Sequence, residues 1–221
     1  MRHQLGWVDQ QGEDRETIVD TALGALCMEA ADASGPAALS APAAAAAMVL
    51  LSHSIEVHED MQAAQQSRDD RDAVWWVWGP AQAINVGDGL HALARLSLFR
   101  MAGDALAAPA MFAALETLDQ AALEYYEGQF LDLQMQERID VTLDEYRKMA
   151  SKKFGSLVGG SLAMGRSVSG ASASEVAAWK QAGRAFGLAA SISDDTRVFW
   201  SDQSQTGRAL NKSKLYPVVL A

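Results

Sequence analysis

The amino-acid sequence predicts an all-α fold, a bundle of long helices joined by short connections. Long stretches contain few glycines and prolines, and their apolar residues recur at spacings of three and four, as in LEYYEGQFLDLQM. The alternation of apolar and polar residues that marks a half-buried strand is nearly absent. The chain has 221 residues, of which 49% are hydrophobic and 21% charged. This length and composition fit a globular domain with a full core.

Several of the expected helices begin with recognisable signals. Thr142 followed by Glu145 forms a capping box, and Ser172 or Ser174 precedes the last long helix. Pro42 is expected to open a helix, because proline is tolerated in the first turn and an alanine run follows it. The expected helices cover residues 42–65, 80–102, 109–136, 142–165 and 174–200. The expected connections cover residues 31–41, 66–80, 103–109, 137–142 and 166–173, and their shortness favours mostly antiparallel neighbours.

Net charge and cysteine content disfavour some classes of partner. The formal net charge of −10 argues against nucleic acid and against anionic membrane surfaces. Cys27 is the single cysteine, so no intramolecular disulfide is possible and a cytoplasmic protein is expected. Its apolar surroundings favour a buried structural thiol. No signal peptide is expected, because the N-terminal stretch MRHQLGWVDQQGEDR has no apolar core. No transmembrane segment is expected, because no uninterrupted apolar stretch reaches ~18 residues.

Two acidic stretches look like metal-binding motifs that lack their last carboxylate. They read VHEDMQA at residues 57–63 and DDTRV at residues 194–198. Carboxylates at positions i and i+4 of a helix share one face, so two such helices facing each other would cage Mg²⁺ around a diphosphate. Solvated helix ends are the alternative interpretation. The candidate metal ligands are Glu59, Asp60, Asp194 and Asp195.

Further stretches, in order along the chain, carry a resemblance to a known family. EGQFLDL is similar to a Gly-Gln-x-x-Asp segment, MASKKFGSLVGGS to a Lys-Thr segment and TGRALNKSKLYPVVLA to a lysine-bearing tail loop. HEDMQ, WGPAQAINVGDGLHALA and FGLAASISDDTRVFWSD complete the set. Together they resemble the polyprenyl synthetase family, the trans-prenyl diphosphate synthases of the isoprenoid synthase fold. The resemblance implies a helical bundle around a central pocket, Mg²⁺ as cofactor and an allylic prenyl diphosphate as substrate.

The sequence departs from the family pattern where the family binds isopentenyl diphosphate. The family's Gly-Lys-Arg aligns with Glu16, Thr17 and Ile18, and its paired arginines align with Arg68 and Asp69. A lysine and two arginines are lost and a carboxylate is gained. Because Arg–phosphate contacts are strong charge-assisted pairs, this site is expected to be degraded.

The half of the site that holds the allylic diphosphate is better preserved. The resemblance places Arg68, Lys153 and Lys214 on the diphosphate, with Lys212 as a less favoured alternative to Lys214. It also assigns catalytic roles to Lys153, Gln129 and Asp132. For the last two residues, hydrogen bonds on a polar helix flank are an equal alternative.

Other positions bear on the pocket and on the metal ligands. Ser54, Trp75 and Phe154 are expected to line the pocket, where a small residue at position 54 suggests room for a long prenyl tail. Core packing is an alternative role for the tryptophan. Ala63 and Val198 remove the fifth position from both acidic motifs. A shifted register with Glu56 could supply a replacement ligand, Ser191 replaces a usual glutamine, and Phe154 replaces a usual threonine.

The family usually has more chain before this start and further helices after the tail loop. Residues 1–221 are therefore expected to form a single isoprenoid synthase-like domain, shortened at both ends. Association as a homodimer, or with another prenyl synthase chain, would cover the apolar surface left exposed.

Three functions remain open on the sequence. The first is an enzyme that ionises one allylic diphosphate for transfer or cyclisation. The second is a non-catalytic regulatory subunit of a heteromeric prenyl diphosphate synthase. The third is a divergent chain-elongating prenyltransferase, against which Asp69 argues.

Overall fold

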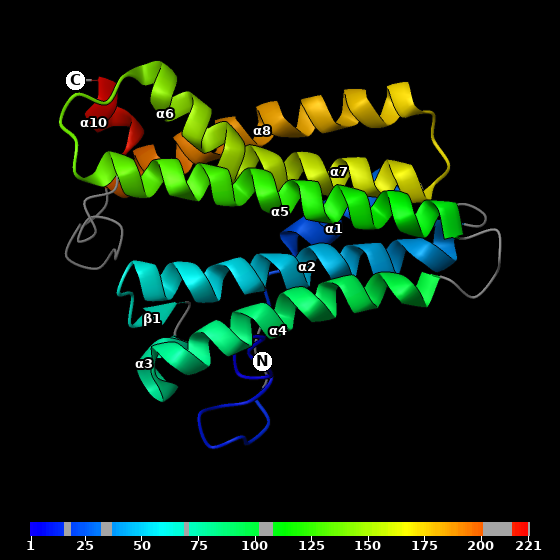
Figure 1. Ribbon diagram of the computed structural model, residues 1–221, viewed down its shortest axis with the longest axis horizontal. Helices are drawn as coiled ribbons and strands as arrows, with labels where there is room; N and C mark the ends of the chain where they lie inside the picture. Colours follow the sequence, from blue (N-terminus) through cyan, green and yellow to red (C-terminus); the bar gives the residue numbers. More distant parts are fainter. Residues whose placement is uncertain (16–18, 32–36, 69–70, 102–107, 201–213, 221) are drawn as a thin grey trace.

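The computed structural model describes residues 1–15, 19–31, 37–68, 71–101, 108–200 and 214–220 as a bundle of helices (Figure 1). The all-α prediction is confirmed. Successive long helices alternate in direction, as the colour change along each ribbon shows. The helices are α1 (Ala22–Ala30), α2 (Ala37–Gln62), α3 (Val74–Trp78), α4 (Pro80–Leu98), α5 (Ala108–Gln136), α6 (Leu143–Ala150), α7 (Ser156–Val168), α8 (Ala173–Trp200) and α10 (Tyr216–Leu220).

Short elements connect or interrupt these helices. The strands β1 (Ser67–Arg68) and β2 (Arg71–Asp72) form an antiparallel pair between α2 and α3. A 3₁₀ turn, η1 (Phe99–Met101), follows α4, and a π-helical turn, η3 (Ser151–Gly155), separates α6 from α7. Helix α2 packs along α4, while α7 packs against α1, α2, α5 and α8.

Helix α2 begins five residues before the predicted start at Pro42, which lies in its second turn. A proline so near a helix start removes one intrahelical hydrogen bond and leaves the later turns intact. The five alanines that follow Pro42 have the highest helix propensity and offset that loss. The prediction that residues 31–41 form a connection is therefore wrong for residues 37–41, which belong to α2.

The main hydrophobic core lies between α2, α5 and α7 and contains Met48, Leu51, Leu118 and Met164. Small alanines and glycines beside these residues let the helices approach closely. Within the described residues, one segment, Ser40–Gln62 of α2, is long and apolar enough to cross a membrane. More than half of its most apolar window, 56%, is buried in the bundle. Core helices of soluble proteins pass the same test.

The structure confirms some of the other helix boundaries predicted from the sequence and corrects the rest. The expected helices at 80–102, 109–136 and 174–200 are confirmed within a few residues, and Ser172 caps α8 through its bond to the Glu175 amide. The predicted connection 66–80 contains the strand pair and α3, and the helix at 22–30 was not predicted. The predicted helix 142–165 is interrupted by η3 and ends later, at Val168. Local propensity does not reveal such a turn, because tertiary contacts hold it.

Candidate functional site

The centre of the site is Lys153, which lies in the π-helical turn η3. A π turn breaks the regular helical spacing and so changes the direction of the side chains in it. The Ser156 hydroxyl donates to the carbonyl of Lys153 at 2.9 Å and to that of Ala121 on α5 at 3.1 Å. These bonds tie the turn to α5. The Lys153 residue is only 5% exposed, so its ammonium group lies inside the bundle.

Helix α5 passes so close to η3 that position 128 requires glycine. A Cβ at Gly128 would lie 2.7 Å from the backbone nitrogen of Lys153 and 2.8 Å from its Cγ. A side chain there would push the two segments apart. Gly128 therefore sets the separation between α5 and the central lysine.

The Lys153 ammonium lies between two carboxylates from different helices. Its Nζ is 2.8 Å from Asp132 Oδ2 on α5 and 3.1 Å from Glu59 Oε1 on α2. Burial alone would lower the pKa of Lys153, but the two carboxylates outweigh it and hold this pKa above its ordinary value. The lysine is therefore charged at neutral pH. Three of the residues singled out in the sequence are brought into direct contact.

Two side chains, Tyr125 and Lys153, hold Glu59 through the same carboxylate oxygen, Oε1. The Tyr125 hydroxyl donates to Glu59 Oε1, which also contacts Lys153. Burial opposes the negative charge, but Lys153, Tyr125 and Arg68 outweigh it and keep the pKa of Glu59 below its ordinary value. Within the described part of the chain, Oε2 forms no hydrogen bond. Glu59 thus keeps one oxygen available to a ligand.

Asp60 binds the arginine of the short strand β1. Arg68 donates to Asp60 Oδ1 from Nε at 2.9 Å and from Nη2 at 2.7 Å. Burial raises the pKa of Asp60 to about 6, although Arg68 opposes this shift. The pair fixes the strand connection against the end of α2. Arg68 is thereby engaged by a carboxylate before any diphosphate arrives.

The two aspartates of the second acidic stretch have different surroundings. Asp195 is 6% exposed and accepts a hydrogen bond from the Tyr146 hydroxyl at 2.5 Å and from the Tyr216 amide at 3.1 Å. It therefore joins α8 to α6 and α10. Asp194 pairs at 2.6 Å with Arg197, one turn further along α8, and its side chain is 37% exposed.

A cavity of about 30 Å³ lies beside the central lysine and reaches the second acidic stretch. This volume holds about one water molecule. The cavity must widen before a diphosphate can enter. Its lining residues are Asp132, Met149, Lys153, Phe154, Ser191, Asp195, Lys214 and Leu215, five of which were predicted site residues.

The sequence as a whole matches a known family. A profile of the family described as polyprenyl synthetase matches residues 18–213. The chain belongs to the polyprenyl synthetase family. It is 32% identical over 222 residues to (2E,6E)-farnesyl diphosphate synthase of Mycobacterium tuberculosis, covering 98% of this chain and 60% of that protein. It is 31% identical over 228 residues to geranylgeranyl diphosphate synthase of the same species, covering 99% of this chain and 63% of that protein.

Solved structures of polyprenyl synthetases share the fold. The polyprenyl synthetase of Streptomyces coelicolor A3(2) superposes with a TM-score of 0.85 at 30% identity, over 99% of this chain and 65% of that one. The geranylgeranyl pyrophosphate synthetase of Geoglobus acetivorans gives a TM-score of 0.81 at 24% identity, over 99% of this chain and 67% of that one. This chain therefore spans about three fifths of the length of the curated relatives.

Two of the four predicted metal ligands fit the magnesium ion expected of a polyprenyl synthetase. Mg²⁺ prefers carboxylate oxygens and often takes one or two of them, with phosphate and water as its other ligands. Asp60 and Asp195 are buried and bonded to other parts of the protein. Glu59, with its available oxygen, and the more exposed Asp194 fit this donor set. The described residues contain no group of three or more candidate ligands, so a diphosphate would have to complete the site.

The structure also places three other predicted residues, which lie on α2, α3 and α5. Gln129 donates to Gln62 Oε1 at 2.7 Å and so joins α5 to the end of α2. Ser54 is fully buried in α2. Trp75 donates from Nε1 to the Gln65 carbonyl at 2.6 Å and packs against a small hydrophobic cluster. Their proposed roles in catalysis and in the pocket stay predictions.

Several residues of the expected isopentenyl site cannot be placed. Glu16, Thr17, Ile18 and Asp69 lie outside the described residues, as does Lys212. The loss of the isopentenyl site therefore stays a prediction that rests on the sequence. Lys214, the favoured lysine of the tail loop, is described and lines the cavity.

Two tyrosines that hold the site were not predicted. Tyr125 lies four residues before Gln129, so the helical spacing already places it on the same face of α5. That spacing could have identified it. Tyr146 contacts Asp195, which lies 49 residues away, and no local pattern indicates this contact.

Proposed function

We propose that this chain acts in isoprenoid biosynthesis by ionising an allylic prenyl diphosphate without isopentenyl diphosphate as a second substrate. The observation that carries this proposal is the meeting of Glu59, Asp132 and Lys153 beside a cavity in a polyprenyl synthetase fold. Such a convergence of charged groups from separate helices suits a polyanionic ligand and its counterions. The replacement of three cations at the expected isopentenyl site supports the single-substrate reaction.

Lys153 is the residue that binds the diphosphate most directly in this proposal. An ammonium group has three donors, of which Asp132 and Glu59 engage two. One donor remains for a diphosphate oxygen. Because Lys153 is held charged, it would stabilise the negative charge that develops on the leaving diphosphate.

Glu59 and Asp194 would hold the magnesium ion together with the diphosphate. When bound, Mg²⁺ neutralises charge on the leaving group. Tyr125 would orient Glu59 by donating to Oε1, which leaves Oε2 for the ion. Asp60 and Asp195 would support this arrangement by fixing β1 and α10.

Two aromatic rings close to Lys153 would stabilise an allylic cation in this proposal. Lys153 Nζ lies 5.8 Å from the ring centre of Tyr125 and 5.9 Å from that of Phe154. Aromatic faces attract cations, including a carbocation left when the diphosphate departs. The same rings would exclude water from the reacting carbon.

The test is release of diphosphate from farnesyl and geranylgeranyl diphosphate, with Mg²⁺ and with or without isopentenyl diphosphate. We expect release that does not require isopentenyl diphosphate. An Asp194→Ala variant should lose most of it, whereas an Arg197→Ala variant, which removes one partner of Asp194 and keeps its carboxylate, should keep it. Release only in the presence of isopentenyl diphosphate would instead identify a chain-elongating enzyme.

A second candidate function is a non-catalytic subunit of a heteromeric prenyl synthase. Two sets of ion pairs favour it: Arg68 pairs with Asp60, and Lys153 pairs with two carboxylates. Carboxylates of the protein therefore already balance the positive charges that a diphosphate would need. Ala63 and Val198, in place of the fifth acidic residues, favour it as well. Absence of diphosphate release under all the conditions above would support this function over the first.

A further inference from the structure

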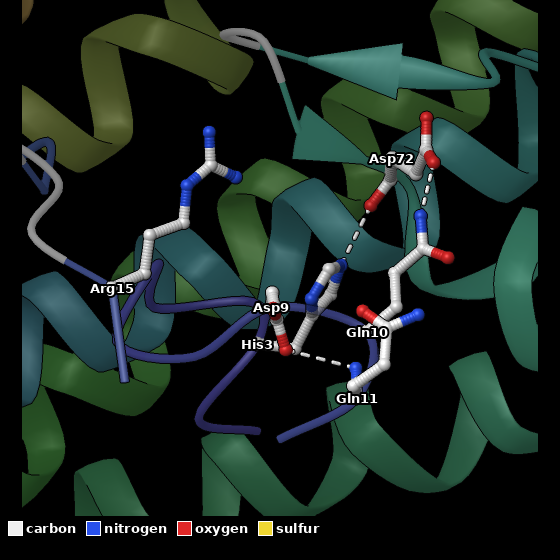
Figure 2. Close-up of a pocket in the computed structure, with 6 residues that line it drawn as sticks. All are labelled: His3, Asp9, Gln10, Gln11, Arg15 and Asp72. Carbon is white, nitrogen blue, oxygen red and sulfur yellow. Dashed lines mark hydrogen bonds between the residues drawn. The ribbon is translucent and has the colours of Figure 1, made fainter. Parts of the chain in front are cut away.

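The N-terminal segment, residues 1–15, is bonded to the strand β2 at Asp72 (Figure 2). His3 Nε2 lies 2.8 Å from the backbone carbonyl of Asp72. The side-chain amide of Gln10 donates to the carboxylate of the same residue. The segment therefore holds β2 through both its backbone and a side chain. Neither His3 nor Gln10 belongs to the site described above.

His3 is a rigid donor to this strand. A carbonyl oxygen only accepts hydrogen bonds, so Nε2 carries a proton and donates to the Asp72 carbonyl. The residue is 6% exposed, and its ring lies edge-on to that of Trp78, at 4.8 Å between ring centres. Burial and this ring contact hold the imidazole in one orientation. Because the bond lies away from water, it is electrostatically stronger than an exposed one.

The same segment is also attached to helix α2. Gln4 is 1% exposed and donates to the carboxylate of Glu56 at 3.3 Å. Leu5 packs in a small hydrophobic cluster with Val57 of α2 and Val74 of α3. The segment thus connects β2 with the part of α2 that carries the first acidic stretch. It therefore helps to set where β2 lies relative to this helix.

The strand β2 in turn supports the arginine of the site. It pairs antiparallel with β1, where Ser67 lies opposite Asp72 and Arg68 lies opposite Arg71. Arg68 donates two hydrogen bonds to Asp60, at 2.9 Å and 2.7 Å. An isolated pair of such short strands has little stability of its own, so its position depends on contacts with the rest of the protein. The two bonds at Asp72 are among these contacts.

We infer that His3 is a positioning residue for Arg68. By fixing Asp72, it holds the strand pair, and with it the guanidinium, against the acidic end of α2. A guanidinium has five N–H donors, of which Asp60 engages two within the described residues. The Arg68 side chain is 27% exposed, so a diphosphate can approach it from solvent. This last step rests on the proposed function, whereas the positioning of Arg68 does not.

The first test needs no ligand and follows the Nε–Hε signal of Arg68 by nuclear magnetic resonance. An Arg68→Lys variant assigns the signal, and the exchange of its hydrogen with water reports the bond to Asp60. His3→Phe keeps a ring against Trp78 and removes the donor, so we expect this exchange to become about three- to tenfold faster. His3→Gln keeps an N–H donor and should restore the wild-type rate.

Two further variants separate this role from general effects of the segment. Gln10→Ala removes the other bond to Asp72 at an exposed residue, where the chain tolerates substitution, so it should act in the same direction. Arg2→Gln should leave the signal unchanged, because Arg2 pairs with the exposed Asp14 at 2.9 Å. The inference is overturned if His3→Phe leaves the exchange unchanged, or if His3→Gln speeds it as much as His3→Phe.

The second test measures, by calorimetry, the binding of the slowly ionising analogue farnesyl thiolodiphosphate with Mg²⁺. We expect His3→Phe to weaken binding about three- to tenfold, and to have no effect when Arg68 is already replaced by Met. A purely structural role would lower the affinity equally in both backgrounds, and that result also overturns the inference. Absence of binding by the wild-type chain would overturn the proposed function instead, and the Arg68 signal would still decide the role of His3.

Discussion

Among single residues, Lys153 is the one on which the carboxylates of Glu59 and Asp132 depend. Replacing it with Met leaves Glu59 and Asp132 without their cation while preserving most of the side-chain volume. Breaking a buried ion pair in this way costs about 3 kcal/mol, so we expect Lys153→Met to lower the free energy of unfolding by that amount. Urea denaturation measures it.

The neighbouring residue provides a matched control. Lys152 pairs with Glu127, whose side chain is 63% exposed. Exposed ion pairs contribute about 1 kcal/mol or less, so Lys152→Met should change stability much less than Lys153→Met. Equal effects of the two substitutions would show that Lys153 is not the organising charge.

Cys27 should resist thiol reagents in the folded protein. The residue is fully buried, and burial raises the pKa of its thiol to about 12. Because the thiolate is the reactive species, labelling at pH 8 should be about a thousandfold slower than in denatured protein. The rate of reaction with a chromogenic disulfide checks this. Rapid labelling of folded protein would contradict the described packing of α1.

The sequence could indicate which residues belong to the candidate site where a motif identifies them. It could not indicate which side chains those residues contact. Glu59, Asp132 and Lys153 could be selected from motifs, but the sequence does not show that one ammonium group bonds both acids. The sequence likewise does not show that Asp60 pairs with Arg68, because the chain must turn back at β1 to bring the two side chains together. Side-chain partners depend on tertiary structure, which spacing alone does not define.

Among the elements, the contact between α5 and η3 is the most sensitive. Gly128→Ala would place a Cβ 2.7 Å from the Lys153 backbone, so either the turn or the helix must shift. Overpacking of this kind costs about 1–3 kcal/mol. We expect that loss in urea denaturation. Glu116→Ala, on an exposed face of the same helix, should change stability by less than about 0.5 kcal/mol.

The capping box of α6 should contribute measurably to stability. The Thr142 hydroxyl accepts from the Glu145 amide, and the Glu145 carboxylate accepts from the Thr142 amide at 2.8 Å. Thr142→Ala should cost about 1 kcal/mol, because one amide of the first turn loses its partner. Thr142→Ser retains the hydroxyl and serves as the control. The idea fails if the two variants have the same urea midpoint.

Helices with clear periodicity and caps were predictable from the sequence, and interruptions were not. Residues 109–136 were correctly assigned because their apolar stripe is continuous. The π turn was missed because its one glycine, Gly155, is tolerated within helices, and because the contacts with Gly128 and Ser156 that accompany the turn are not visible in the sequence. The early start of α2 was missed because Pro42 gives a strong but misleading local signal.

For the whole molecule, the bundle could be predicted because composition, helical periodicity and motif order all agree. The expected association with a second chain stays a prediction. Large apolar side chains on α5 are nevertheless exposed, with Phe112 at 64%, Leu123 at 63% and Phe130 at 61%. The size of the prenyl pocket was not predictable, because it depends on how far the helices part around a cavity that is narrow in this structure.

We propose that the charged cluster around Lys153 binds a prenyl diphosphate together with magnesium. The most direct measurement is calorimetric titration with farnesyl thiolodiphosphate, in which a sulfur atom slows ionisation, with and without Mg²⁺. We expect saturable binding that needs Mg²⁺, is weakened at least about tenfold by Glu59→Gln and is unchanged by Lys152→Met. Failure to bind with Mg²⁺, or equal binding by the Glu59→Gln variant, would contradict it.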